Sequence, residues 1–111
     1  MATPIFTPAA CVMFVGSDPA IRDLCAKGLP GLHLLRVGHA AAAVERMLVT
    51  RPLAIVVDES LHTTDLERVV ECARDIRAEV VHSSKRAGSE LVTAVQSAVL
   101  AAERNRESSS A

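Results

Sequence analysis

The 111-residue sequence contains no tryptophan or tyrosine, and Phe6 and Phe14 are its only aromatic residues apart from histidine. Aromatic side chains provide the stacking platforms that bind single-stranded nucleic acid and many of the anchors of tight protein interfaces. An excess of basic charge is also lacking, since the formal net charge is −1. General nucleic-acid binders carry a basic stripe. We therefore expect no nucleic-acid partner.

Long apolar runs are absent as well. None reaches the ~18 residues that a membrane span needs, because charged residues such as Arg22, Arg36 and Glu45 interrupt each candidate. The first ten residues carry no Lys or Arg ahead of their apolar residues, unlike a secretory signal. We expect a cytoplasmic protein with no membrane partner, and at ~100–200 residues per domain a single domain.

Clustered metal ligands are the third absence. Cys11, Cys25 and Cys72 are far apart in the sequence and odd in number, and the four histidines form no pair at helical spacing. A zinc site needs thiolates or imidazoles close together. Glycine-rich phosphate-binding motifs are missing too. We expect no metal, no cofactor, and cysteines that are buried as small apolar residues.

What the sequence does contain is a regular alternation of apolar, β-branched runs with amphipathic segments. The runs predict strands at residues 11–15, 32–37, 53–57 and 79–83. The amphipathic segments predict helices at residues 18–28, 38–50, 64–76 and 88–104. Strict alternation predicts an α/β fold, a three-layer flavodoxin-like sandwich with a parallel sheet of about four strands. We expect an N-terminal extension at 1–9, the domain at 10–104 and a disordered polar tail at 105–111.

Local signals define the predicted helices further. Asp18 is the expected N-cap of the first helix, and Thr64 with Glu67 forms a capping box for the third. The spacing of apolar residues predicts which side chains of the first three helices face the core. These are Ile21, Leu24, Cys25 and Gly28; Ala40, Ala43, Val44, Met47 and Leu48; and Leu66, Val69, Val70, Ala73 and Ile76.

Polar residues follow three of the predicted strands. They are Gly16-Ser17-Asp18, Asp58 and Ser83-Ser84-Lys85. Ligands of such sheets bind at the carboxyl ends of the strands. We therefore expect these three segments to converge at one edge of the sheet and to contain any functional site.

Two segments resemble the receiver domains of bacterial response regulators. Residues 31–58, GLHLLRVGHAAAAVERMLVTRPLAIVVD, match the family pattern without a gap, with Ala43, Arg51, Pro52 and Asp58 in register. VGSDPAIRDL, which includes Asp18, is similar to the family's VDDDPAIREL. The resemblance covers about half of the chain.

The resemblance implies that Asp58 occupies the position of the phosphoacceptor. Receivers move a phosphoryl group from a kinase histidine to this aspartate, with Mg²⁺ held by an acidic pair after the first strand. Here that pair is replaced by Gly16 and Ser17, so we expect no metal site. Asp58 is then either a vestigial phosphoacceptor or an inherited carboxylate that loop amides or Lys85 satisfy.

The chain also has one strand–helix unit fewer than a typical receiver. Its last predicted strand corresponds either to the family's fourth, with Ser83 or Ser84 as the switch hydroxyl, or to its fifth, with Lys85 contacting phosphate. The switch is incomplete, because no Phe or Tyr follows Phe14. These departures indicate a degenerate, shortened pseudo-receiver.

For such a remnant we expect a non-catalytic, phosphorylation-independent role in protein–protein interaction within bacterial signalling. The partner is expected to be a signalling protein or a kinase-related component, or a second copy bound through the last helix and the edge strand. The predicted interaction surface is the apolar face of the last helix, formed by Leu91, Val92, Val95, Val99 and Ala102. The alternative is a single-domain response regulator that accepts a phosphoryl group on Asp58.

Overall fold

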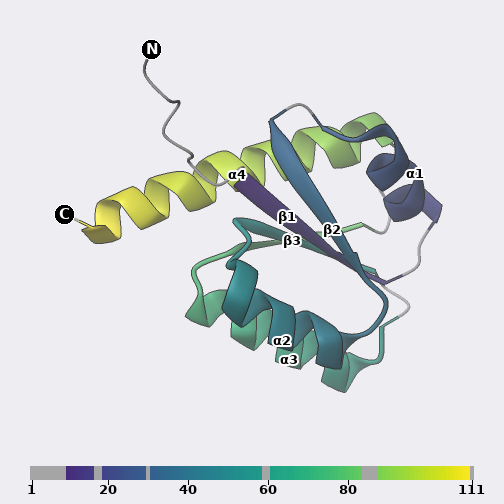
Figure 1. Ribbon diagram of the computed structural model, residues 1–111, viewed down its shortest axis with the longest axis horizontal. Coiled ribbons are helices and arrows are strands. Elements are labelled where there is room, and N and C mark those ends of the chain that lie inside the picture. Colours follow the sequence, from purple (N-terminus) through teal and green to yellow (C-terminus); the bar gives the residue numbers. More distant parts are fainter. Residues whose placement is uncertain (1–9, 17–18, 30, 59–60, 84–87, 111) are drawn as a thin grey trace, which may run out of the picture.

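The computed structural model describes residues 10–16, 19–29, 31–58, 61–83 and 88–110, with the backbone alone for Ala20, Gly88 and residues 106–110. Strands and helices alternate along the chain, as predicted (Figure 1). The strands are β1 (Ala10–Val15), β2 (Leu32–Val37), β3 (Ala54–Val57) and β4 (Glu79–His82). The helices are α1 (Pro19–Lys27), α2 (Ala40–Thr50), α3 (Thr63–Asp75) and α4 (Gly88–Ser110).

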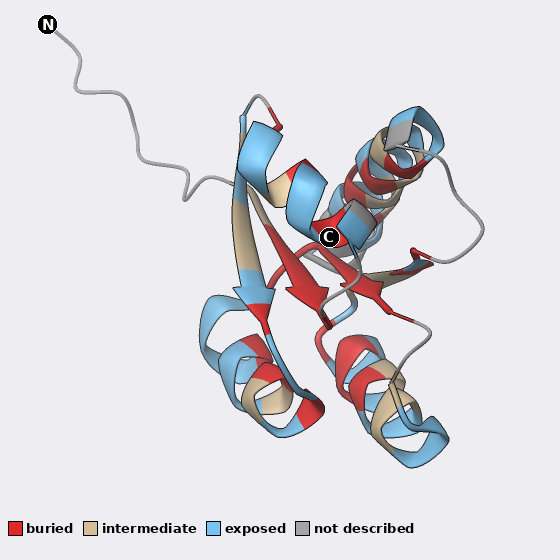
Figure 2. Ribbon diagram, turned by 90° about the vertical axis from the view of Figure 1, so that its right-hand side faces the viewer, coloured by how far each residue is buried: buried red, intermediate tan, exposed pale blue. Residues whose placement is uncertain are grey.

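The four strands form one parallel sheet in the order β2-β1-β3-β4. This order is that of the first four strands of a flavodoxin-like sheet, 2-1-3-4-5. The central strands pair in register from Val12 with Ala54 to Val15 with Val57. Both central strands are apolar and buried along nearly their whole length (Figure 2). Such continuous burial is expected where helices cover both faces of a parallel sheet.

Two helices cover each face of the sheet, which confirms the three-layer sandwich. Val12 and Phe14 of β1 pack in the cluster that contains α1 and α4, whereas Met13 and Val15 pack in the cluster that contains α2 and α3. Right-handed crossovers from β2 to β3 and from β3 to β4 place α2 and α3 on the same face. Since α1 alone would otherwise cover the opposite face, α4 returns to it and packs over β3 and β4.

Histidine side chains cap α2 and α3. His39 Nδ1 accepts a hydrogen bond from the Ala42 amide at 3.4 Å, and His62 Nδ1 accepts one from the Thr64 amide at 3.4 Å. The predicted capping box beginning at Thr64 is therefore wrong, because Thr64 lies inside the first turn of α3. A neutral imidazole can accept at an N-cap as an Asn or Asp side chain does, but histidine is not among the usual capping residues.

The residues predicted to face the core are buried or half-buried except at two positions. In α2, Ala40, Ala43 and Met47 are buried, but Leu48 is 64% exposed. One residue corresponds to about 100° of rotation around a helix, so Leu48 points away from the direction of Met47. Gly28 does not face the core either: it follows the end of α1 with a φ of 75°, and its amide bonds to the Leu24 carbonyl.

The helix α4 continues to Ser110, through most of the segment predicted as a disordered tail at 105–111. No Gly or Pro follows Gly88 in the chain, and the Glu and Arg residues of this segment are good helix formers. Asn105 also connects the helix to the sheet, since its Nδ2 donates to Glu79 Oε1 at 3.3 Å. In Figure 1 the C-terminal end of α4 extends beyond the ends of the strands.

Within the described ranges, no helix combines the length and the apolar character that crossing a membrane requires.

Candidate functional site

Three residues lie in a row at the carboxyl edge of the sheet, each directly after a strand. Gly16 follows β1, Asp58 follows β3 and Ser83 follows β4. Backbone hydrogen bonds fix the row, because the Asp58 amide donates to the Val15 carbonyl at 3.1 Å and the Ser83 amide to the Val57 carbonyl at 2.9 Å. The predicted convergence is confirmed for these three residues.

The other predicted members of this site are Ser17, Asp18, Ser84 and Lys85, and they lie outside the described residues. The roles proposed for Ser84 and Lys85 in contacting phosphate stay predictions. The position of the last strand is defined, because β4 pairs with β3. This is the place of the fourth strand in the 2-1-3-4-5 order.

Gly16 and Asp58 are in direct contact. A Cβ added to Gly16 would lie 2.4 Å from Asp58 Cβ and 2.9 Å from Asp58 Oδ2. Gly16 also has a φ of 121°, in the region that only glycine adopts easily. The Asp58 side chain therefore fills the space that any side chain at position 16 would need.

Asp58 and Ser83 are the buried polar residues of the described part of the chain, with exposed fractions of 6% and 2%. Both have an interaction partner, as expected for buried polar groups. Among the described residues no buried side-chain nitrogen or oxygen is left without a hydrogen bond. Asp58 is thus largely shielded from solvent and has an interaction partner.

The described residues do not fit the Mg²⁺ ion that the receiver resemblance implies. Magnesium requires several oxygen ligands in a near-octahedral arrangement. Gly16 offers no side chain, and the space beside it is filled by Asp58. No group of three or more His, Cys, Asp or Glu residues within the described ranges could hold a metal ion.

The predicted interaction surface on α4 is wrong. Leu91, Val95, Val99 and Ala102 are buried in the core, and Val92 is half-buried against it. Figure 2 shows this buried stripe along α4. The reason is the packing of the helix: α4 covers β3 and β4 on the face that α1 leaves open, so its wide apolar face is buried within its own chain. β4 is an edge strand, as predicted, and its pairing with another chain stays a prediction.

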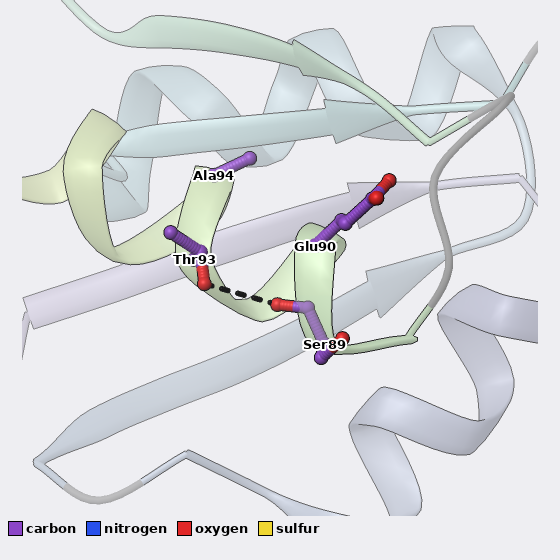
Figure 3. Close-up of a pocket in the computed structure, with 4 residues that line it drawn as sticks. All are labelled: Ser89, Glu90, Thr93 and Ala94. Atoms are coloured by element: carbon purple, nitrogen blue, oxygen red, sulfur yellow. Dashed lines mark hydrogen bonds between the residues drawn. The ribbon is translucent and has the colours of Figure 1, made fainter.

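A surface hollow of about 370 Å³ lies near the start of α4, lined by Ser89, Glu90, Thr93 and Ala94. All four residues come from one helix (Figure 3). The Thr93 hydroxyl donates to the Ser89 carbonyl at 3.0 Å, a bond within the helix. Ligand sites usually gather polar groups from several elements into a concave pocket. This hollow lacks such convergence, because all four lining residues belong to α4.

The three cysteines are free thiols, of which Cys72 is buried and Cys11 and Cys25 are half-buried. Burial is the main cause that raises the pKa of all three. The neighbouring Thr50 side chain and the charge of Arg36 lower the pKa of Cys11 and Cys25 in part, whereas Asp75 raises that of Cys72 further. Since the thiolate is the nucleophile, these environments do not activate the cysteines.

We expect these thiols to react at neutral pH at least several-fold more slowly with Ellman's reagent in the folded protein than in urea, and Cys72 to be the slowest. The double variant Cys11→Ser/Cys25→Ser isolates Cys72 for this measurement. Equal rates for folded and unfolded Cys72 would contradict this expectation.

The raised pKa of the thiols also predicts a pH dependence of stability. Unfolded thiols lose their protons near pH 9.0 and the folded ones at higher pH, so the free energy of unfolding should fall as the pH rises above 9.0.

Comparison with family models, with curated proteins and with solved structures finds no match to this chain.

Proposed function

We propose that this protein is a receiver-like module of bacterial signalling that binds a partner protein and does not transfer a phosphoryl group. The observation that carries the proposal is the contact between Gly16 and Asp58. In a receiver the corresponding position is acidic and helps to hold Mg²⁺ beside the phosphoacceptor. In this chain the position has no side chain, and Asp58 packs against its backbone.

The surroundings of Asp58 argue against a phosphoacceptor. Phosphorylation adds up to two negative charges and three oxygen atoms, which need both space and a neutralising cation. Asp58 is only 6% exposed, and its side chain lies within van der Waals contact of the backbone of Gly16. A phosphoryl group would have to displace this contact without the carboxylates that screen its charge in a metal-assisted transfer.

Binding remains as the function that a receiver-like fold can perform without this chemistry. The proposed setting is the bacterial cytoplasm, with a signalling protein or a kinase-related component as the partner. The near-neutral net charge of −1 and the scarcity of aromatic residues favour a protein partner over nucleic acid.

An amide NMR titration with Mg²⁺ and beryllofluoride, a mimic of aspartyl phosphate, tests the proposal. We expect no significant shifts of the Asp58 and Ser83 amides, because the carboxylate is shielded and lacks an acidic neighbour at position 16. The Asp58→Asn variant, titrated in parallel, separates site binding from nonspecific effects. Large shifts that disappear in Asp58→Asn would overturn the proposal in favour of a single-domain response regulator phosphorylated on Asp58.

A further inference from the structure

The outer surface of α2 exposes large apolar side chains. Val49 is 83% exposed and Leu48 is 64% exposed. The third large apolar residue exposed in the described part of the chain, Leu100, lies apart from them on α4. Exposed single apolar residues are common on proteins, whereas larger apolar patches mark interaction sites.

A hollow of about 550 Å³ lies next to Val49, lined by Ala42, Glu45, Arg46, Val49 and Thr50. Ala42 and Val49 are seven residues apart, so they lie on the same face of the helix, two turns from each other. Glu45 and Arg46 lie between them, and both are exposed. This face therefore has a small residue at one end, a protruding apolar residue at the other, and opposite charges in the middle.

We propose that this face of α2 binds a second copy of the chain, with the two α2 helices antiparallel and the two-fold axis between Glu45 and Arg46. In this arrangement Val49 of each copy lies over Ala42 of the other. Glu45 of each copy faces Arg46 of the other, so the contact contains two pairs of opposite charge. The surface is self-complementary, as a two-fold dimer interface must be.

Charge selects the antiparallel arrangement over the parallel one. In a parallel pair of α2 helices, Glu45 would face the partner's Glu45 and Arg46 the partner's Arg46. Like charges directly opposite each other repel. A parallel pair would also place Val49 against Val49 and leave the hollow over Ala42 unfilled.

The dimer should be weak, because α2 has only 11 residues. A contact limited to one such helix falls below the roughly 1,200 Å² that specific interfaces usually bury. We expect a dissociation constant on the order of 100 μM.

This dimer contact goes beyond the proposed function and does not depend on it. No residue of the α2 hollow belongs to the edge of the sheet formed by Gly16, Asp58 and Ser83.

Sedimentation equilibrium from about 10 μM to about 1 mM tests the dimer. We expect Glu45→Arg and Arg46→Glu, each alone, to weaken self-association roughly tenfold, because each places like charges opposite one another. An equimolar mixture of the two single variants should associate about as well as the wild type, since both pairs across the heterodimer are then of opposite charge. Glu71→Arg, at an exposed position of α3, should have no effect.

The mixing experiment separates this geometry from a general change in charge or stability. Wild-type protein that is monomeric at about 1 mM would overturn the inference. A dimer that both single variants leave intact, or a mixture that associates no better than either variant alone, would also overturn it and place the contact elsewhere. A contact surface away from positions 45 and 46 would not explain why mixing the two variants recovers association.

Discussion

Replacing Gly16 with alanine is expected to lower the free energy of unfolding by about 3 kcal/mol. Two costs add up. An L-residue at a φ of 121° is strained by roughly 1–3 kcal/mol. The new Cβ would also lie 2.4 Å from Asp58 Cβ, and overpacking of this kind costs roughly 1–3 kcal/mol more. Urea denaturation followed by circular dichroism measures the loss.

Gly31→Ala is the matched control for this substitution. Gly31 also has a positive φ, 75°, but nothing lies within 4 Å of the position that its Cβ would take. Its replacement should cost only the backbone strain, about 1–2 kcal/mol. If Gly16→Ala were no more destabilising than Gly31→Ala, Asp58 would not pack against Gly16 as the structure has it.

A double-mutant cycle separates the two costs at position 16. The nearest atom to the added Cβ is Asp58 Cβ, so Asp58→Ala keeps the clash and should not rescue Gly16→Ala. Asp58→Gly removes that atom and should recover part of the loss, which appears as a coupling energy between the two positions. The strain of the positive φ would remain.

The same contact predicts that an acidic residue at position 16 should not create the metal site of the receivers that the chain resembles. Gly16→Asp would introduce a larger side chain into the space that Asp58 already fills. The missing side chain at position 16 and the shielding of Asp58 are therefore linked, because the absence of a Cβ at Gly16 allows the close approach. A metal site beside Asp58 would require Asp58 itself to move.

The strands and most helices could be predicted from the sequence because their signals are local. The run from Leu53 to Val57 is continuously apolar and ends at Asp58, and it forms a buried central strand, β3, within one residue of the predicted start. The convergence of Gly16, Asp58 and Ser83 followed from topology alone, since parallel strands end at the same edge. Their close packing depends on the backbone angle of Gly16, which the sequence does not specify.

The features that could not be predicted depend on non-local packing or on unusual capping. The helix α4 packs on the part of the sheet that α1 does not cover. Predicting this face requires the positions of all the other helices. The N-caps His39 and His62 were missed because histidine is not a typical cap. The exposed face of α2 was missed because the spacing of Leu48 predicts a core-facing residue. In the structure, the helix is oriented so that Leu48 points to solvent.

Leu91→Ala is expected to destabilise the fold by about 3 kcal/mol. Leu91 is fully buried in the core cluster that α4 forms with the sheet. Truncating a buried leucine removes apolar contacts and leaves a cavity, at a cost of roughly 2–5 kcal/mol. Thermal and urea unfolding measure the loss. Leu100→Ala is the control, because Leu100 is 56% exposed on the same helix and should change stability by less than about 0.5 kcal/mol.

The concentration dependence of this loss distinguishes a core position from an interface position. If Leu91 stabilised the protein by contacting another chain, the effect of its truncation would grow with protein concentration, because association stabilises by mass action. As a core residue it should cost the same in dilute and in concentrated samples. If the loss appeared only at high protein concentration, the apolar stripe of α4 would be an interaction surface between chains. In that case α1 alone would cover the face of the sheet that α1 and α4 share in the structure.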